Sequence, residues 1–339
     1  MSRSSQCDGG RWEMDANKRL SELSNGYQHA IVLLTAARAG VFAAMGRQAQ
    51  PADALARRLG FDARALEIVL LALAADGIVT REDDGFRIHP DFAPLLLPDS
   101  PTTQDSILKH NYACMKRWMS LDEVLRTGRP ASEPAALLPH EDMRNFICGM
   151  ANISRLSSAE VAARVDLSGF RRMIDVGGGP ATSSIVFCQK YPQLNCVVFD
   201  LPGPLRIARE EIARAGMDAR IETRAGDYFR DELGEGFDLA YVSNIIHSMG
   251  PDDSLMLMRK CHRALTPDGT LLVKDFFLDD SRTAPNFAAF FSVNMLTGTA
   301  QGKSYTLRET QDLLARAGFG DFRHLDVAAA SGLLIARKA

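Results

Sequence analysis

The fold is decided by a stretch in the middle of the chain, Met173-Ile174-Asp175-Val176-Gly177-Gly178-Gly179. Its first four residues predict a short buried strand. The three glycines allow a tight turn and let a ligand approach the backbone closely. The segment from Ser183 to about Tyr191 then predicts a helix, so the chain folds back beside its own strand.

A second apolar run, Cys196 to Phe199, predicts a second strand that ends at Asp200. Strand, glycine turn, helix, strand and acid is the order of half a nucleotide-binding unit. The carboxylate of Asp200 can accept two hydrogen bonds from a ribose diol. Asp175, just before the glycines, would repel a pyrophosphate but suits the cationic methionine part of S-adenosylmethionine. We therefore expect S-adenosylmethionine as the cofactor.

Length and composition narrow the class of protein. The chain has 339 residues, enough for two domains, and 46% of them are hydrophobic. Its net charge of -3 gives no general attraction to nucleic acid or anionic membranes. No apolar run is long enough to span a membrane, and the polar start lacks the apolar core of a signal peptide. We expect a cytoplasmic protein in which residues 1–16 form a disordered tail.

The cysteines do not predict a metal site. None of the six is in a CxxC spacing, which fits a reduced protein better than a disulfide framework or a zinc centre. Cys188 and Cys196 lie in apolar surroundings and are expected in the core.

Residues 17–100 have the pattern of a winged helix. A helix-period apolar pattern runs from Asn17 to about Met45, and shorter helices are predicted at 51–59 and 62–75. A two-stranded hairpin follows at 77–88, with Asp84-Gly85 as its turn. The 62–75 helix carries one base, Arg64, and the hairpin tip is acidic, which disfavours a DNA-binding face. We expect a dimerisation module instead.

Residues 101–165 are predicted to form a helical roof. After a linker at 90–101, helices are expected at 105–126 and 141–165, with a loop at 128–139 between them. Large flexible and aromatic side chains recur on both helices at helical spacing. They are core residues or line an apolar substrate pocket; the four that we assign to the pocket are Met115, Trp118, Phe146 and Met150.

The remainder, residues 166–339, is expected to be the catalytic domain. A third strand at 221–225 is followed by Gly226, Asp227, Tyr228 and Phe229, where a carboxylate and an aromatic ring suit an adenine. Fourth and fifth strands are predicted at 237–242 and 269–274. Closing strands at 322–327 and 332–337 would alter a plain doubly wound order, so we expect a mixed sheet.

Two residues at strand ends are candidates for catalysis. In open α/β sheets the ligand crevice lies at the carboxyl ends of the strands. His247 follows the fourth strand, where a general base can reach a bound substrate. Asp275 ends the fifth strand and can orient the imidazole and stabilise its charged form.

Two helices are expected in the C-terminal part of the chain. One runs over 286–297, and we assign its Asn294 and Met295 to the substrate pocket. The other runs over 306–317, with Thr306 and Glu309 forming a capping box.

Together these motifs resemble class I S-adenosylmethionine-dependent O-methyltransferases, above all the group of plant caffeate and hydroxyindole enzymes and bacterial natural-product enzymes. The resemblance implies a Rossmann-like α/β domain with a mixed seven-stranded sheet, an N-terminal winged-helix domain that forms a homodimer, and a role in secondary metabolism. It places His247 as general base, Asp275 beside it, and the cofactor on Gly177, Gly179, Asp200, Leu201, Asp227 and Tyr228 or Phe229.

Three positions depart from that family pattern. Ser243, which we also assign to the cofactor, stands where caffeate enzymes carry a lysine. Ser248 and Met249 replace the usual Asp-Trp after the histidine, and Ser304 stands where a second acid is common.

The sequence therefore predicts methylation of a hydroxyl on a small aromatic or enolic molecule, with His247 removing the proton. N-, S- or C-methylation, or a non-methylating reaction on the same fold, is a second hypothesis. A winged-helix regulator that senses a small ligand is a third.

Overall fold

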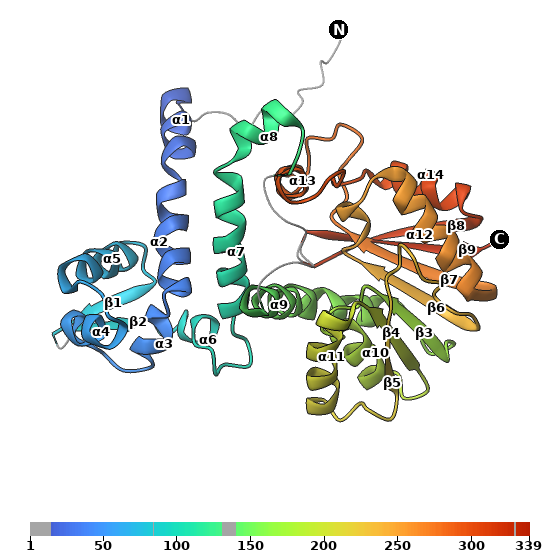
Figure 1. The fold of residues 1–339 in the computed structure, drawn as a ribbon, viewed down its shortest axis with the longest axis horizontal. Helices are drawn as coiled ribbons and strands as arrows, with labels where there is room; N and C mark the ends of the chain where they lie inside the picture. Colours follow the sequence, from blue (N-terminus) through green and yellow to red (C-terminus); the bar gives the residue numbers. More distant parts are fainter. Residues whose placement is uncertain (1–14, 84, 131–139, 329) are drawn as a thin grey trace, which may run out of the picture. The chain divides into compact units, whose positions relative to one another are not determined.

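The computed structural model describes residues 15–83, 85–130, 140–328 and 330–339, and the chain divides into two compact units at Thr103–Gln104 (Figure 1). The predicted N-terminal tail, Asp84 of the predicted hairpin turn and most of the predicted 128–139 loop fall outside these residues. Each unit is described by itself below.

The first unit is a helical module with a two-stranded hairpin, as the winged-helix pattern predicted. The expected long helix over 17–45 is three helices, because Gly40 adopts φ 75° and a further break falls at Gly26. The predicted linker over 90–101 contains a short helix. The elements are α1 (Ala16–Asn25), α2 (Tyr27–Arg38), α3 (Val41–Met45), α4 (Ala52–Leu59), α5 (Ala63–Ala75), β1 (Val79–Glu82), β2 (Gly85–Ile88) and α6 (Ala93–Leu96).

The second unit begins with helices α7 (Asp105–Trp118), α8 (Leu121–Thr127) and α9 (His140–Arg164). We expected one helix over 105–126, but the chain breaks after Trp118 and restarts at Leu121. The residues between them still form turn-like hydrogen bonds, such as Ser120 N–H to the carbonyl of Arg117 at 3.0 Å. A break this short leaves the apolar spacing almost unchanged, so periodicity could not detect it.

A seven-stranded sheet forms the centre of the second unit, in the order β5-β4-β3-β6-β7-β9-β8. The first five strands of that order are mutually parallel, while β9 is antiparallel to both β7 and β8, so the expected mixed sheet is confirmed. The strands are β3 (Arg172–Val176), β4 (Asn195–Asp200), β5 (Ile221–Ala225), β6 (Phe237–Ser243), β7 (Leu265–Asp275), β8 (Phe319–Val327) and β9 (Ser331–Lys338). β7 starts at Leu265 rather than at the predicted residue 269.

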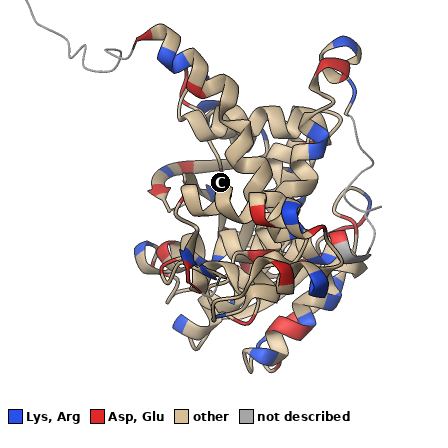
Figure 2. Cartoon of the chain, turned by 90° about the vertical axis from the view of Figure 1, so that its left-hand side faces the viewer, with Lys and Arg blue, Asp and Glu red and all other residues tan. Residues whose placement is uncertain are grey.

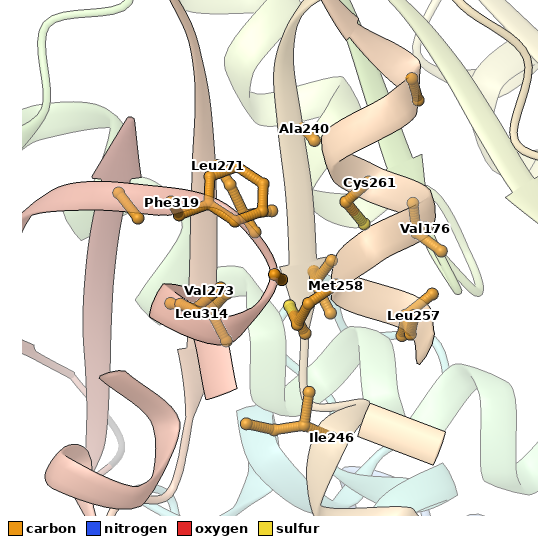
Figure 3. Packing of buried hydrophobic residues seen from close by; sticks show 14 of the residues in the cluster. Val176, Ala240, Ile246, Leu257, Met258, Cys261, Leu271, Val273, Leu314 and Phe319 are labelled. Carbon is orange, nitrogen blue, oxygen red and sulfur yellow. The ribbon is translucent and has the colours of Figure 1, made fainter. Parts of the chain in front are cut away.

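Helices bury both faces of the sheet. On one face, alternate residues such as Val176 and Val273 pack with α12 (Pro251–Ala264) and α14 (Leu307–Arg316) (Figure 3). On the other, Met173 and Leu272 pack with α9, α10 (Thr182–Lys190) and α11 (Pro202–Arg214). Cys188 and Cys196 are buried on this second face, as predicted. Parallel strands covered on both sides read as continuous apolar runs, which explains why they were found in the sequence.

Within the described residues, no helix combines the length and hydropathy needed to cross a membrane. The same residues contain no group of histidine, cysteine, aspartate and glutamate side chains that could hold a metal ion.

The predicted capping box is present at the start of α14. Thr306 Oγ1 accepts from Glu309 N–H at 3.0 Å, and the Glu309 carboxylate accepts from Thr306 N–H at 2.8 Å. We expect Thr306→Ala to lower the free energy of unfolding of the second unit by about 1 kcal/mol, because the Glu309 amide loses its hydroxyl acceptor. Thr306→Ser keeps the hydroxyl and is the matched control; equal losses in both variants, measured by urea denaturation, would contradict the capping argument.

Candidate functional site

The candidate site lies where the strand order reverses. The chain passes from β3 outward to β4 and β5, then returns to place β6 beside β3. Their carboxyl ends diverge at this switch point, which is where open α/β sheets bind ligands. Three predicted features follow neighbouring strands there: the glycine turn after β3, His247 after β6, and Asp275 at the end of β7.

The glycine turn is tightly packed on one side and open on the other. Gly177 has φ 68°, and a Cβ there would lie 2.4 Å from Ile245 Cδ1. A Cβ on Gly178 would lie 2.8 Å from the carboxyl carbon of Asp175. At Gly179 nothing lies within 4 Å of a Cβ position. A ligand can therefore approach the backbone at Gly179, while the other two glycines let the turn pack.

Asp175 lies beneath this turn rather than in front of it. Its carboxylate is buried and accepts a hydrogen bond from Ser184 Oγ at 2.7 Å. Burial raises the pKa of Asp175 to about 7; the Ser184 hydrogen bond opposes the shift and the nearby Asp200 carboxylate adds to it. We expected Asp175 to face the cationic part of the cofactor; in the structure its Oδ2 ties the turn to α10.

Asp200, by contrast, is placed as predicted at the end of β4. Its two carboxylate oxygens accept from Gly179 N–H at 2.8 Å and from Leu201 N–H at 2.7 Å. Burial raises the pKa of Asp200, and these two amides oppose the shift. Each oxygen keeps a free lone pair, so the carboxylate can still accept from a diol. Leu201 beside it is exposed.

The segment after β5 forms the third part of the candidate site, beside the glycine turn and Asp200. Gly226 is required there, since a Cβ would lie 2.3 Å from the ring of Phe199. Asp227 Oδ1 accepts from Phe229 N–H at 2.9 Å. The rings of Tyr228 and Phe229 lie 4.8 Å apart, with Phe229 exposed. A carboxylate and two aromatic rings are therefore available to bind a nucleobase such as adenine.

His247 and Asp275 are in direct contact. His247 lies in a short 3-10 turn (Ile246–Ser248), and its Nδ1 is 2.6 Å from Asp275 Oδ1. The same oxygen accepts from Phe276 N–H at 2.8 Å, while Asp275 Oδ2 is buried without a partner among the described residues. A carboxylate only accepts, so Nδ1 donates and the lone pair of Nε2 is left for another group.

Aromatic rings fix the plane of the imidazole. Phe276 stacks on it at 6.1 Å, and Phe291 from α13 (Asn286–Gly298) meets it edge-on at 4.7 Å. The loop after α13 supports the backbone of His247, because a Cβ on Gly302 would lie 2.5 Å from its carbonyl oxygen. The ring is thus held at a defined position with 8% of the residue exposed.

Residues of the predicted roof come from α7, α9 and α13. Trp118 Nε1 donates to Asn294 Oδ1 at 3.1 Å, and its ring stacks on Phe290 at 6.4 Å. Phe146 on α9 packs against His110 on α7. The other three predicted lining residues are half-buried on the same helices: Met115, Met150 and Met295. Thus the structure joins Trp118 with Asn294 and leaves the methionines as partly open apolar surface.

One polar pair at the site was missed by the sequence analysis. Lys274, next to Asp275, is fully buried and donates to Asn244 Oδ1 at 3.2 Å. Burial lowers the pKa of Lys274 to about 8, and the charge of Asp275 opposes the shift. A lysine at the end of the apolar run Leu271-Leu272-Val273 was the available signal. Ser243, expected at the cofactor, pairs with Lys274 across the two strands.

A hollow of about 600 Å³ lies at the opposite edge of the sheet. It is lined by residues at the start of β3, β4 and β5, including Arg172, Asn195 and Ile221. These are the amino ends of the strands, so this hollow is separate from the site around His247.

The residues present fit S-adenosylmethionine. Gly179 leaves open space at the turn, and Asp200 keeps acceptor capacity for a ribose. The paired rings of Tyr228 and Phe229 offer a stacking surface for adenine. No feature of this arrangement conflicts with the expected cofactor.

Comparison with known proteins agrees with this geometry. A model of the O-methyltransferase domain family matches residues 134–320, and a model of the DprA winged helix domain matches residues 29–85. The structure is similar to that of human N-acetylserotonin methyltransferase in complex with S-adenosylmethionine, with a TM-score of 0.87, 26% identity, and coverage of 97% of this chain and 99% of that one.

Curated relatives match along nearly the whole length. The chain is 34% identical to 3-hydroxy-5-methyl-1-naphthoate 3-O-methyltransferase from Streptomyces sahachiroi, over 94% of this chain and 95% of the relative. It is 30% identical to acetylserotonin O-methyltransferase from Bos taurus, over 94% and 97% of the two chains. With a winged-helix first unit, a mixed seven-stranded sheet and these matches along nearly its whole length, the chain belongs to the S-adenosylmethionine-dependent O-methyltransferases that act on small molecules.

Proposed function

We propose that this enzyme methylates a hydroxyl group on a small bicyclic aromatic or enolic acceptor, with His247 as general base. The observation that carries the proposal is the 2.6 Å contact between His247 Nδ1 and Asp275 Oδ1, which leaves Nε2 as the proton acceptor. When bound, S-adenosylmethionine supplies an electrophilic methyl group. The protein then has two tasks: to align the acceptor oxygen and to remove its proton.

Proton removal is assigned to the imidazole and its stabilisation to the carboxylate. As Nε2 takes the proton of the acceptor hydroxyl, the ring becomes positively charged. Asp275, buried and hydrogen-bonded to Nδ1, balances that charge in surroundings where few water molecules can do so. Phe276 and Phe291 keep the ring from rotating away.

We assign the cofactor to the three parts of the candidate site: the glycine turn, Asp200 and the segment after β5. The open backbone at Gly179 receives the methionine part, Asp200 the ribose hydroxyls, and Asp227 with Tyr228 or Phe229 the adenine. Gly177 and Gly226 serve by keeping side chains out of the packed corners, since a Cβ at either would clash with Ile245 or Phe199.

The acceptor class follows from the roof and from the relatives. Trp118, Phe290 and Phe146 offer flat apolar surfaces, and the half-buried methionines adapt to an irregular ligand. The relatives named above act, by their names, on a hydroxynaphthoate and on acetylserotonin, whose ring systems are bicyclic. C-methylation remains the rival, since a relative with 27% identity is an L-tyrosine C(3)-methyltransferase.

We also propose a homodimer through the first unit. Large apolar side chains are exposed on α1 and at the start of α2: Leu20, Leu23 and Tyr27 are each more than half exposed. Such a row on one helical segment favours burial against a second copy. Acidic and basic segments are interspersed along the ribbon in Figure 2, and α5 carries Arg64 as its only base, so a nucleic-acid face is disfavoured.

His247→Ala should reduce kcat on a hydroxyl acceptor by about 10²–10⁴-fold, because the general base is lost. Calorimetric binding of S-adenosylhomocysteine should stay within twofold of wild type. His262→Ala, whose ring packs on Phe319 instead, is the matched control. Full activity in His247→Ala would show that alignment alone suffices or that the nucleophile is not a hydroxyl.

Asp275→Asn should lower kcat by at least tenfold while leaving KM for the acceptor nearly unchanged, since the amide keeps an acceptor for Nδ1 but loses the negative charge. The double variant with His247→Ala should be no slower than His247→Ala alone, because both residues act as one unit. Additive losses of kcat in this double-mutant cycle would show that Asp275 acts independently of His247.

Leu23→Asp should convert the dimer to a monomer, measured as a halved mass by light scattering coupled to size exclusion. The added charge would be desolvated in the proposed interface. Leu156→Asp, on an equally exposed apolar position of α9, should leave the mass unchanged. A wild-type protein that elutes as a monomer at every concentration would rule the dimer out.

A further inference from the structure

Lys274 carries a buried positive charge, and among the described residues no carboxylate is hydrogen-bonded to its ammonium. It is fully buried, and the only hydrogen-bond acceptor that its ammonium contacts among the described residues is Asn244 Oδ1, at 3.2 Å. The face of Phe276 lies 6.0 Å from Nζ. An ammonium has three donors, so two of them are left without a protein acceptor.

Burial of an ammonium is costly when no counter-ion is hydrogen-bonded to it. The penalty amounts to several kcal/mol, and a single amide oxygen with an aromatic face offsets only part of it. Lys260, also buried, illustrates the satisfied case: it donates to the carbonyls of Tyr228 and Asp231, each at 2.8 Å. The difference in hydrogen bonding between Lys260 and Lys274 indicates that Lys274 can bind an anionic group of a ligand.

The position of Lys274 places this anionic group near the glycine turn. Lys274 pairs with Ser243 across β6 and β7, where Ser243 is the last residue of β6 and Lys274 the last but one of β7. Asn244, which it contacts, has φ 57° and leads directly into Ile245, whose side chain packs on Gly177. The ammonium is thus connected through two consecutive residues to the glycine turn.

Neighbouring residues of β7 point to opposite faces of the sheet. Strand alternation places Lys274 on the face of Leu272, which packs with α9 and α10, whereas Asp275 shares the face of Val273. Both groups nevertheless approach Phe276, whose ring centroid lies 6.0 Å from Lys274 Nζ and 6.1 Å from the centroid of the His247 imidazole. The glycine turn and α10, which begins directly after it, belong to the side of Lys274.

Resting on the proposed function, we propose that Lys274 binds the carboxylate of the methionine part of S-adenosylmethionine. The predicted partners around the turn, Asp175 and Asp200, are both acids and cannot hold a carboxylate. The cofactor's amino-acid end carries one, and it needs a donor with positive charge. Lys274 supplies that donor, and Asn244, which it contacts, precedes the residue whose side chain packs on the glycine turn.

The test compares two ligands that differ only in this group: S-adenosylmethionine and decarboxylated S-adenosylmethionine, each titrated calorimetrically into the full-length protein. Wild type should bind the carboxylated ligand about tenfold or more tightly than the decarboxylated one, as expected for a charge-assisted hydrogen bond. In Lys274→Met this preference should fall below about threefold, mainly through weaker binding of S-adenosylmethionine.

Two further variants make the test specific. Lys190→Met removes a lysine on α10 that donates to the carbonyl of Ala162, and it should keep the wild-type preference. Lys274→Gln keeps a donor for Asn244 without the charge and should behave as Lys274→Met; circular dichroism checks that both are folded. The wild-type comparison requires no variant, so it can overturn the proposal even if these variants misfold.

Each contrary outcome has a separate meaning. Equal binding of both ligands by wild type, or an unchanged preference in Lys274→Met, overturns the proposal. An equal weakening of both ligands means that Lys274 only holds Asn244 in place, which also overturns it. If Lys274→Met raises the KM for the acceptor but leaves the cofactor affinity unchanged, Lys274 binds an anionic group of the acceptor. That result overturns the assignment to the cofactor. If wild type binds neither ligand, the proposed function itself fails.

Discussion

The hydrogen bond between His247 and Asp275 depends on the parallel pairing of β6 with β7. Ser243 and Lys274 are in register, so the residues that follow them leave the sheet at the same level. The 3-10 turn then brings His247 back over the end of β7, to 2.6 Å from the carboxylate. A shift of one residue in this register would move Asp275 to the opposite face of the sheet.

The same pairing explains why polar groups can be buried at this edge. Asp175, Asp275 and Lys274 are all inaccessible, each at or near the end of a parallel strand covered by helices on both faces. A carboxylate or ammonium in such a place is tolerated only when hydrogen bonds or a ligand satisfy it. Asp175 is satisfied within the fold by Ser184, whereas Asp275 and Lys274 keep unfilled capacity.

Much of this could be predicted from the sequence, because strand alternation and glycine turns are local. The strands around the Gly177 turn, the cap at Thr306 and the pairing of His247 with Asp275 were all predicted before the structure. Errors arose where local pattern is ambiguous. The break after Trp118 falls within an unbroken apolar period, and the extra residues of β7 before Gly269 include a proline and an aspartate, which are uncommon in strands.

By itself, the sequence determined which residues end each strand, and therefore which side chains gather at the carboxyl edge of the sheet. Only the tertiary structure decided which way those side chains face. Asp175 points beneath the turn because Gly178 packs against it, and Lys274 meets Asn244 because β7 lies beside β6. Strand order and the packing of α9 and α10 are non-local, so no spacing along the chain encodes the direction of a buried charge.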